Sequence, residues 1–514
     1  MKRHALVSEG TILRLLQAGQ KAFQECKYDE CFETFERARR LAPASATILL
    51  DIGGFHVRRN EHAKAAECFD RALKLSPNKT ATLENAGKRC SDGSAYALAR
   101  QYLEQAAAQQ DVTAEALAAL GGVYERLRRM DDANAVADRA IKLNPNSTAA
   151  ILIRARLDHL AGRNAEAEAR LRAFTTSREE VAARVRASYE LGAILDRQGR
   201  YDEAMTAFQH AKDMLRPNAP AYAADLKLTR DRLAALVDSL TPEILQRWKD
   251  SLPAYSPTMR LTLLGGHPRS GTTLLEQVVD SHPEIVSAEE TDVFHNDTYY
   301  PLRSHLPITT PILDELEQFP TATIQKARLN YSRRIQTFLD KPLGDRLLVD
   351  KNPTLTFLVP AMARIFPEIK FLIALRDPRD VCMSCFMQPL ALHQVSSAWL
   401  TLEGTMTEYI ALMGGWRQTM PKLPNPVLEV RYEDMVEDLE PVARKTLDFL
   451  GVAWDPKVLG FDEHARQKAV RSPTYSDVTK KVFKTAVGRW RNYQKYFEPH
   501  LAKLEPLAKA MGYE

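Results

Sequence analysis

The sequence predicts a multidomain protein in which an N-terminal all-α superhelix of repeats precedes a C-terminal α/β domain with a central parallel sheet. Small residues recur every 34 positions through the first 217 residues. Beyond residue 255, short apolar runs alternate with helical segments, and GGHPRSGTT at 265–273 has the outline of a phosphate-binding P-loop. A chain of 514 residues is also too long for one hydrophobic core, so we expect at least two domains.

Composition excludes several classes of protein. The chain is 45% hydrophobic and 26% charged, which is typical of globular proteins. Its net charge of +4 is too small to indicate a nucleic-acid partner. No stretch approaches 18 uninterrupted apolar residues, so we expect no membrane span, and the N-terminus lacks the apolar core of a signal peptide. Six cysteines are too few for a disulfide scaffold, and we therefore expect a cytoplasmic protein.

Residues 1–217 are predicted to be a repeat array of about six units. Positions at which a small residue lets paired helices approach closely keep a step of 34 in three columns. These columns are Gly19, Gly53, Gly87 and Gly121; Cys31, Ala65, Ala99, Ala133 and Ala167; and Ala38, Ala72, Ala106 and Ala140. The pattern resembles the tetratricopeptide repeat (TPR), a helix-turn-helix unit that stacks into a superhelix. Two roles stay open, a structural or dimerisation role and the binding of a peptide or partner protein on the concave face.

A capping helix and linker are predicted at 218–255. The segment AYAADLKLTRDRLAALVDSL at 221–240 has apolar residues at roughly helical spacing. The stretch LPAYSPTM at 252–259 then marks a domain boundary, because proline interrupts regular structure. The C-terminal domain is accordingly expected to cover 256–514.

Four apolar runs in this domain predict strands that alternate with helices. They are RLTLLGG at 260–266, RLLVDK at 346–351, KFLIALRD at 370–377 and PVLEVRYED at 426–434. Alternation of this kind favours a parallel sheet covered by helices, with the ligand at the carboxyl ends of the strands. The polar clusters of the domain follow these strand ends.

The loop at 265–273 is predicted to bind an anion. Backbone N–H groups at a helix start face an anion, and the helix dipole adds to the attraction. Arg269 supplies a forked guanidinium group that can bind phosphate or sulfate oxygens. Thr272, however, occupies the position of the lysine of NTPase P-loops. The loop therefore points to a phosphate-bearing ligand other than a Mg²⁺-bound nucleoside triphosphate.

A second anion site is predicted after the strand at 370–375. Arg376 follows this strand directly, and Ser384 lies eight residues further along the next helix. A structural ion pair of Arg376 with Asp377 or Asp380 is the alternative. The CMSC spacing around Cys382 matches redox and zinc motifs, but no second pair of ligands follows at metal spacing, so no metal site is predicted.

Several separated motifs in residues 260–495 carry a resemblance. The stretches PRSGTTLLEQVVDSHPEIVSAEET, DKNP, RDPRDVCMS, RYEDM and FLGVAWDPKVL resemble, in this order, the sulfotransferases that use 3′-phosphoadenosine-5′-phosphosulfate (PAPS). The tyrosylprotein sulfotransferase branch is most similar. The resemblance implies a P-loop-like sulfotransferase domain that needs no metal, releases 3′,5′-ADP, and sulfates an acceptor hydroxyl, with a protein or peptide tyrosine favoured. A repeat array joined to such a domain is similar to the TPR-sulfotransferase proteins of bacteria, in which the repeats would recruit a substrate or partner.

The resemblance also implies roles for individual residues. For catalysis it implies Glu290 as the base that accepts the proton of the acceptor, with Lys351 and Arg269 as cations that stabilise the transferring group. For donor binding it implies Arg269, Ser270, Gly271, Thr272 and Thr273 at the 5′-phosphosulfate, Arg376 and Ser384 at the 3′-phosphate, and Tyr432, Arg489 and either Ser472 or Thr474 elsewhere around the donor. His295 is a rival candidate for the base.

Other functions remain open from the sequence. Asp292 and Asn296 stand where the tyrosylprotein branch has basic residues suited to acidic peptides, so a carbohydrate or lipid hydroxyl is an alternative acceptor. A TPR scaffold with a nucleotide-sensing pseudoenzyme domain is a second alternative. The third is a P-loop kinase or NTPase that uses LLVD at 347–350 as its metal-binding strand, although the missing loop lysine argues against it.

Overall fold

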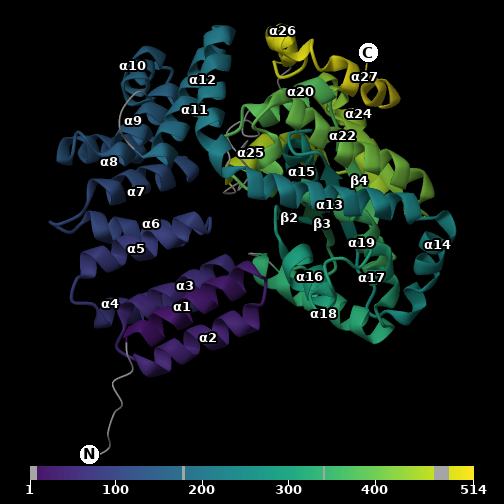
Figure 1. Ribbon diagram of the computed structural model, residues 1–514, viewed down its shortest axis with the longest axis horizontal. Helices are drawn as coiled ribbons and strands as arrows, with labels where there is room; N and C mark the ends of the chain where they lie inside the picture. The colour runs from purple at the N-terminus through teal and green to yellow at the C-terminus, as the bar shows by residue number, and fades with distance from the viewer. Residues whose placement is uncertain (1–8, 176–179, 340–341, 390, 468–484, 514) are drawn as a thin grey trace, which may run out of the picture. The chain divides into compact units, whose positions relative to one another are not determined.

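The computed structural model describes residues 9–175, 180–339, 342–389, 391–467 and 485–513 (Figure 1). The predicted fold class is confirmed, because helical repeats precede an α/β domain with one five-stranded parallel sheet. The chain divides into two compact units, Met1–Arg170 and Leu171–Glu514. The second unit therefore contains the α/β domain together with the last pair of repeat helices.

Twelve helices in the described residues make up the repeats. They are α1 (Glu9–Gln24), α2 (Tyr28–Leu41), α3 (Ala46–Arg58), α4 (His62–Leu75), α5 (Lys79–Asp92), α6 (Tyr96–Ala107), α7 (Ala114–Arg126), α8 (Met130–Leu143), α9 (Thr148–Leu160), α10 (Asn164–Thr175), α11 (Val181–Arg197) and α12 (Tyr201–Leu215). Several begin at a short polar side chain that accepts from a backbone N–H of the first turn, as Ser45 does from Ile48 and Thr113 from Ala116.

The columns of small residues are explained by helix packing. A Cβ atom at Gly53 would lie 2.3 Å from the ring of Phe69, and one at Gly192 would lie 2.5 Å from the ring of Phe208. Each of these two glycines thus accepts the large side chain 16 residues later in the paired helix, whereas a Cβ atom at Gly121 would lie 3.2 Å from Ile153. The other two columns are fully buried, as Ala65 illustrates. The 34-residue period therefore reports one packing contact that recurs from repeat to repeat.

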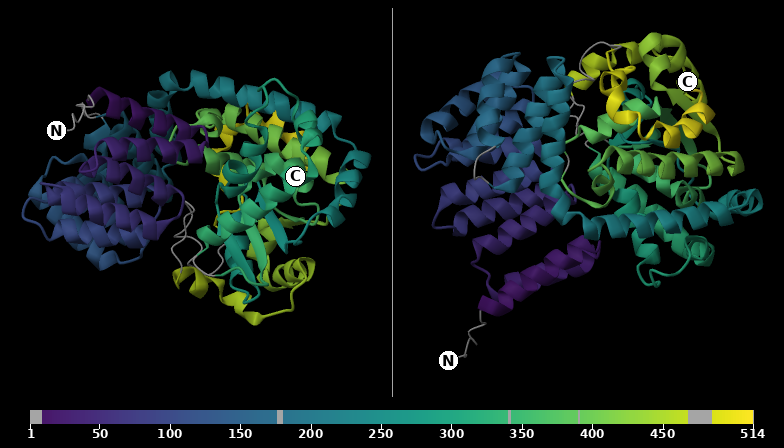
Figure 2. Two further views of the ribbon diagram at one scale, coloured as in Figure 1. Left: turned by 90° about the horizontal axis from the view of Figure 1, so that it is seen from below. Right: turned by 45° about the horizontal axis from the view of Figure 1, so that its top comes forward.

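Two helices connect the repeats to the sheet. The predicted capping helix is α13 (Pro220–Ser239), and α14 (Pro242–Asp250) follows it. Both begin at a proline. Proline has no N–H, and this costs no hydrogen bond here, because an N–H in the first turn of a helix has no acceptor within the helix. Helix α13 packs against α17, α21 and α22 of the same unit (Figures 1 and 2).

The sheet has the strand order β2-β3-β1-β4-β5, and all its pairs are parallel. The strands are β1 (Leu261–Gly266), β2 (Ile285–Glu289), β3 (Leu347–Lys351), β4 (Lys370–Leu375) and β5 (Val427–Arg431). The helical segments among them are α15 (Thr272–Asp280), η3 (Val293–Tyr299), α16 (Tyr300–Arg303), α17 (Ile312–Gln318), α18 (Thr321–Phe338), η4 (Pro353–Leu358), α19 (Val359–Ile365), α20 (Pro378–Phe386), α21 (Gln394–Ala398) and α22 (Leu402–Thr419). Those after β5 are α23 (Tyr432–Glu437), α24 (Leu439–Leu450), η6 (Pro456–Gly460), α25 (Phe461–Gln467), η7 (Arg489–Tyr493), α26 (Gln494–Phe497) and α27 (Leu501–Ala510).

Helices cover the sheet and fix which strand ends meet. Leu264 of β1 and Leu372 of β4 share a buried cluster with Leu275 of α15 and Leu447 of α24. The segment η4 also contacts β1. Because all strands run in the same direction, their carboxyl ends gather at one edge, where polar side chains can meet. Among the helices in the described ranges, none is long and apolar enough to span a lipid bilayer.

Candidate active site

The loop after β1 is a compact turn that leads directly into the start of α15. Gly266, Arg269 and Gly271 all have positive φ angles of 125°, 74° and 93°, the backbone region that glycine adopts most readily. The Thr356 hydroxyl accepts from the Gly266 N–H and donates to its carbonyl, both at 2.8 Å. The first N–H groups of α15 have no carbonyl one turn earlier in the helix, so they are suited to an anion.

Two arginines, a serine and a tyrosine converge beside this loop. Arg269 Nε donates to Ser384 Oγ at 3.0 Å, and Arg376 Nη1 donates to the Arg269 carbonyl at 3.2 Å. The Arg376 guanidinium lies 4.8 Å from the centroid of the Tyr432 ring. A Cβ atom at Gly271 would lie only 2.6 Å from Tyr432, so the ring packs directly on the loop. These five residues come from β1, β4, β5 and the segments that follow them.

The structure contains one of the two ion pairs that are the alternative reading of Arg376, the pair with Asp380. Asp377 pairs with Arg379 at 2.8 Å. Asp380 Oδ2 is 3.9 Å from Arg376 Nη2, but its two oxygens accept from the backbone N–H groups of Gly488 and Trp490, at 2.7 and 2.9 Å. Arg376 Nε is buried without a hydrogen-bond partner among the described residues. Such an atom is suited to an anionic ligand, because an unpaired buried donor is costly.

Lys351, the last residue of β3, lies fully buried among three carboxylates. Its Nζ is 2.7 Å from Glu290 Oε1, 3.4 Å from Glu276 Oε2 and 4.0 Å from Glu289 Oε1. Burial by itself lowers the pKa of Lys351, but Glu276 first, and then Glu290 and Glu289, raise it above its ordinary value. Lys351 is therefore a fixed cation at the end of the central sheet.

Glu290 differs from the other two carboxylates. Its side chain is 35% exposed, whereas Glu276 is fully buried and Glu289 nearly so. Its φ angle of 45° is strained for a non-glycine residue, and its N–H donates to the Lys351 carbonyl at 2.7 Å. The backbone thus turns sharply at the end of β2 and holds this carboxylate against Lys351 while leaving it accessible.

The remaining predicted residues lie apart from these contacts. Arg489 follows Gly488 in η7 and pairs with Asp196 of α11. Thr474 and Ser472 fall outside the described residues. His295 Nδ1 lies 2.6 Å from the amide oxygen of Asn296. The role of Arg489 at a bound nucleotide stays a prediction.

Sequence reasoning missed residues that support the site from behind. His267 of the loop is buried and lies 2.7 Å from Glu408 of α22, and Glu276 of α15 accepts from Ser287 of β2 at 2.6 Å. The sequence signal for Glu276 and Glu408 was a polar residue on an otherwise apolar face of a helix. That signal does not identify the partner of either residue. Contacts across 141 residues cannot be inferred from spacing in a single sequence.

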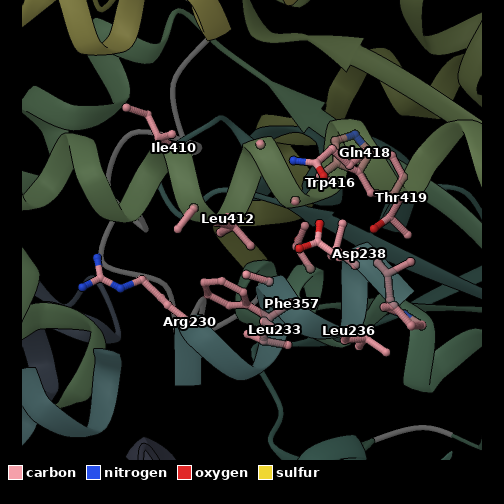
Figure 3. A pocket seen from close by; sticks show the side chains of 18 residues that line it. Arg230, Leu233, Leu236, Asp238, Phe357, Ile410, Leu412, Trp416, Gln418 and Thr419 are labelled. Atoms are coloured by element: carbon pink, nitrogen blue, oxygen red, sulfur yellow. The ribbon is translucent and has the colours of Figure 1, made fainter. Parts of the chain in front are cut away.

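A separate pocket lies between α13, η4, α19 and α22 (Figure 3). It measures about 250 Å³ and has a mainly apolar lining, including Leu233, Phe357 and Trp416. In α22, two consecutive glycines make room for it, and a Cβ atom at Gly414 would meet nothing within 4 Å. Its lining residues include none of the predicted site residues, although Thr356, which holds Gly266, belongs to it.

Two known families match different parts of the chain. Residues 262–456 match the model of the sulfotransferase family, and residues 16–80, 92–148 and 160–222 match the tetratricopeptide repeat. The chain therefore combines a sulfotransferase family domain with tetratricopeptide repeats.

Individual relatives are distant. An uncharacterized protein of Aquifex aeolicus is 24% identical over 341 residues, which are 63% of this chain and 41% of that protein. Protein-tyrosine sulfotransferase 1 of Danio rerio is 25% identical over 289 residues, which are 51% of this chain and 74% of that enzyme. The solved sulfotransferase domain of the Synechococcus PCC 7002 olefin synthase is 21% identical, with a TM-score of 0.35, over 51% of this chain and 96% of that domain. The chain thus spans less than half the length of the Aquifex protein.

Proposed function

We propose that this protein transfers the sulfuryl group of PAPS to an acceptor hydroxyl. The observation that carries the proposal is the convergence of Arg269, Ser384, Arg376 and Tyr432 on the loop after β1, beside the Lys351–Glu290 pair. PAPS carries two anionic ends, a 5′-phosphosulfate and a 3′-phosphate. The site offers helix N–H groups and Arg269 for the first, and the unpaired Nε of Arg376 for the second.

The donor supplies an activated sulfuryl group. A bond forms between the acceptor oxygen and sulfur, the bond between sulfur and the bridging phosphate oxygen breaks, and 3′,5′-ADP leaves. Lys351 and Arg269 are cations held in place before reaction, and they stabilise the charge that develops on that bridging oxygen without reorganising. Lys351 is fixed by three carboxylates and Arg269 by Ser384.

Glu290 accepts the acceptor proton in this proposal. A phenol has an unperturbed pKa of about 10, so at neutral pH its attack needs a base within hydrogen-bond reach. A carboxylate accepts through two oxygens, and Lys351 occupies only Oε1 in the contacts described. Glu290 is also the exposed member of the cluster, which allows an acceptor to reach it.

A protein or peptide tyrosine is the acceptor we favour, and we propose that the TPR array recruits it or a partner. The tyrosine assignment is supported by the named activity of the Danio rerio relative, and the partner by the repeats themselves. Carbohydrate and lipid hydroxyls are the competing acceptors. Incubation with radiolabelled PAPS and a panel of tyrosine peptides, glycans and hydroxylated lipids distinguishes them, since label in the peptides alone supports the tyrosine assignment.

The first test of the proposal is nucleotide binding by calorimetry. We expect 3′,5′-ADP to bind more tightly than ADP or ATP, with no dependence on Mg²⁺, because the loop lacks the lysine of NTPases and the site has a second guanidinium group for the 3′-phosphate. A preference for ATP with Mg²⁺ would identify an NTPase. Absence of any nucleotide binding would leave the repeats as the functional half.

Replacement of Arg376 by alanine tests the 3′-phosphate subsite. We expect the Kd for 3′,5′-ADP to rise about 10- to 100-fold, since a hydrogen bond to a charged group contributes about 1.5–3 kcal/mol. The Kd for ADP, which has no 3′-phosphate, should change much less, and this ligand serves as the matched control. Equal losses for both nucleotides would mean that Arg376 only supports the loop through the Arg269 carbonyl.

A further inference from the structure

The last repeat helices, α11 and α12, belong to the same compact unit as the sulfotransferase domain. The match to the tetratricopeptide repeat nevertheless extends through them, to residue 222. Two of their charged residues, Lys212 and Asp196, are buried at 2% and 7% exposure. Buried charges are costly unless they are paired, so their contacts indicate what this repeat does for the domain.

Lys212 of α12 contacts residues of the sulfotransferase domain and of α11. Its Nζ donates to the Trp399 carbonyl at 2.5 Å and to the Tyr189 hydroxyl at 3.2 Å, and it lies 4.3 Å from the centroid of the Phe386 ring. Burial lowers the pKa of Lys212 to about 7, because an ammonium group loses its hydration at this position. Phe386 is two residues beyond Ser384 in α20, so Lys212 packs behind the proposed anion site.

A buried network continues from Trp399 to the phosphate loop. The Trp399 indole N–H donates to Glu408 Oε2 at 3.3 Å, and His267 Nε2 donates to the same oxygen at 2.7 Å. His267 Nδ1 donates to the Pro268 carbonyl at 2.7 Å. Because both ring nitrogens face acceptors, His267 is an imidazolium paired with Glu408. Burial by itself lowers the pKa of His267, but Glu408 and Cys385 raise it well above its ordinary value.

Asp196 of α11 forms a second path, which leads to Arg376. Its carboxylate accepts from the Tyr493 hydroxyl at 2.7 Å and pairs with Arg489, so it fixes η7. The backbone N–H groups at 488 and 490 in turn donate to Asp380. Arg376 Nη2 donates to the Ala486 carbonyl at 2.5 Å. The segment 486–493 therefore lies between the last repeat and the proposed 3′-phosphate arginine.

We propose that α11 and α12 are positioning elements of the nucleotide site, and that they act at its two ends separately. Lys212 holds the 5′ loop through Trp399, Glu408 and His267, whereas Asp196 holds Arg376 through the segment 486–493. The proposal rests on the function proposed above. It predicts that the last repeat cannot be exchanged for another TPR unit without loss of nucleotide affinity.

The test compares Lys212→Met and Asp196→Asn with wild type, and uses Lys227→Met as the matched control because Lys227 is an exposed lysine of α13. The full chain is used, and the Kd values of ADP and 3′,5′-ADP and the Tm are measured. Lys212→Met should weaken both nucleotides about 3- to 10-fold, because it acts on the shared 5′ loop. Asp196→Asn should weaken 3′,5′-ADP by a similar factor and leave ADP within about 2-fold. These factors correspond to about 0.7–1.4 kcal/mol.

Hydrogen exchange of the loop peptide 265–275 supplies a readout that needs no nucleotide. It should accelerate in Lys212→Met and stay at the wild-type rate in Lys227→Met. Unchanged Kd values together with unchanged hydrogen exchange would overturn the proposal. An equal loss of affinity for both nucleotides in both variants, in proportion to a lower Tm, would also overturn it. If wild type binds neither nucleotide, the proposed function fails, and loop exchange alone decides whether Lys212 holds the loop.

Discussion

Turnover should fall about 10²- to 10⁴-fold in Glu290→Gln, while the Kd for 3′,5′-ADP stays near the wild-type value. Glutamine keeps the shape of the side chain and can still contact Lys351, but it cannot accept a proton at neutral pH. The groups proposed to bind the nucleotide follow β1, β4 and β5, so loss of the proposed base should not affect donor binding. Sulfate transfer from labelled PAPS to a tyrosine peptide found in the acceptor screen measures the first quantity, and calorimetry the second.

Glu284→Gln is the matched control for this experiment. Glu284 immediately precedes β2, whereas Glu290 immediately follows it, and its side chain is exposed. The same chemical change at the far end of the same strand should leave turnover within about 2-fold, as is usual for surface substitutions. Wild-type turnover in Glu290→Gln would remove this residue from the mechanism and direct attention to His295.

Lys351→Met should cost both stability and activity. Removal of one partner from a buried ion pair typically lowers the free energy of unfolding by about 3–5 kcal/mol, because the remaining charge is left uncompensated. Here the group left behind is chiefly Glu276, which is fully buried and 3.4 Å from the ammonium group. Urea denaturation measures the stability, and the sulfate-transfer assay measures the activity.

A double variant separates the two effects. Lys351→Met combined with Glu276→Gln removes the buried cation and its most buried anion together, and glutamine can still accept from Ser287. We expect the double variant to regain most of the lost stability, since replacement of a whole buried pair is often close to neutral. Turnover should not recover, because the cation beside Glu290 is still absent. Recovery of both would show that Lys351 is only structural.

The sequence predicted much of the fold because each prediction rested on a local pattern. The glycine column depends on one kind of contact, that of Gly53 with Phe69, which recurs with the same spacing at Gly19 and Gly87. Strands β1 and β4 are mainly apolar runs, and apart from the first residue of β4 they are buried on both faces. The TPR array and the loop could therefore be recognised without knowledge of any distant contact.

Strand β2 was missed for a physical reason. Its sequence, IVSAE, contains two polar residues, yet all five residues are buried. Ser287 donates to Glu276, and Glu289 lies 4.0 Å from Lys351, so the strand satisfies its polar groups through partners elsewhere in the chain. A pattern of apolar residues cannot reveal such a strand.

The supporting contacts of the site were also out of reach of the sequence. Lys212 lies on a repeat helix, and its partner Trp399 lies 187 residues further along the chain. His267 is buried, and its partner Glu408 lies on a helix that no motif connects to the loop. The partners of such side chains can be identified only from the folded structure.

The strand order has a consequence for how the proposed site could diversify. The groups proposed to face the donor follow β1, β4 and β5, whereas Glu290 follows β2 at one edge of the sheet, and β3 with Lys351 lies between them. The connection from β2 to β3 covers residues 290–346 and includes η3, α16, α17 and α18. Lengthening or rewriting this one connection would reshape the surroundings of the proposed base while the strands of the proposed donor site keep their sequence. With the proposed function, acceptor choice can therefore change in evolution independently of donor binding.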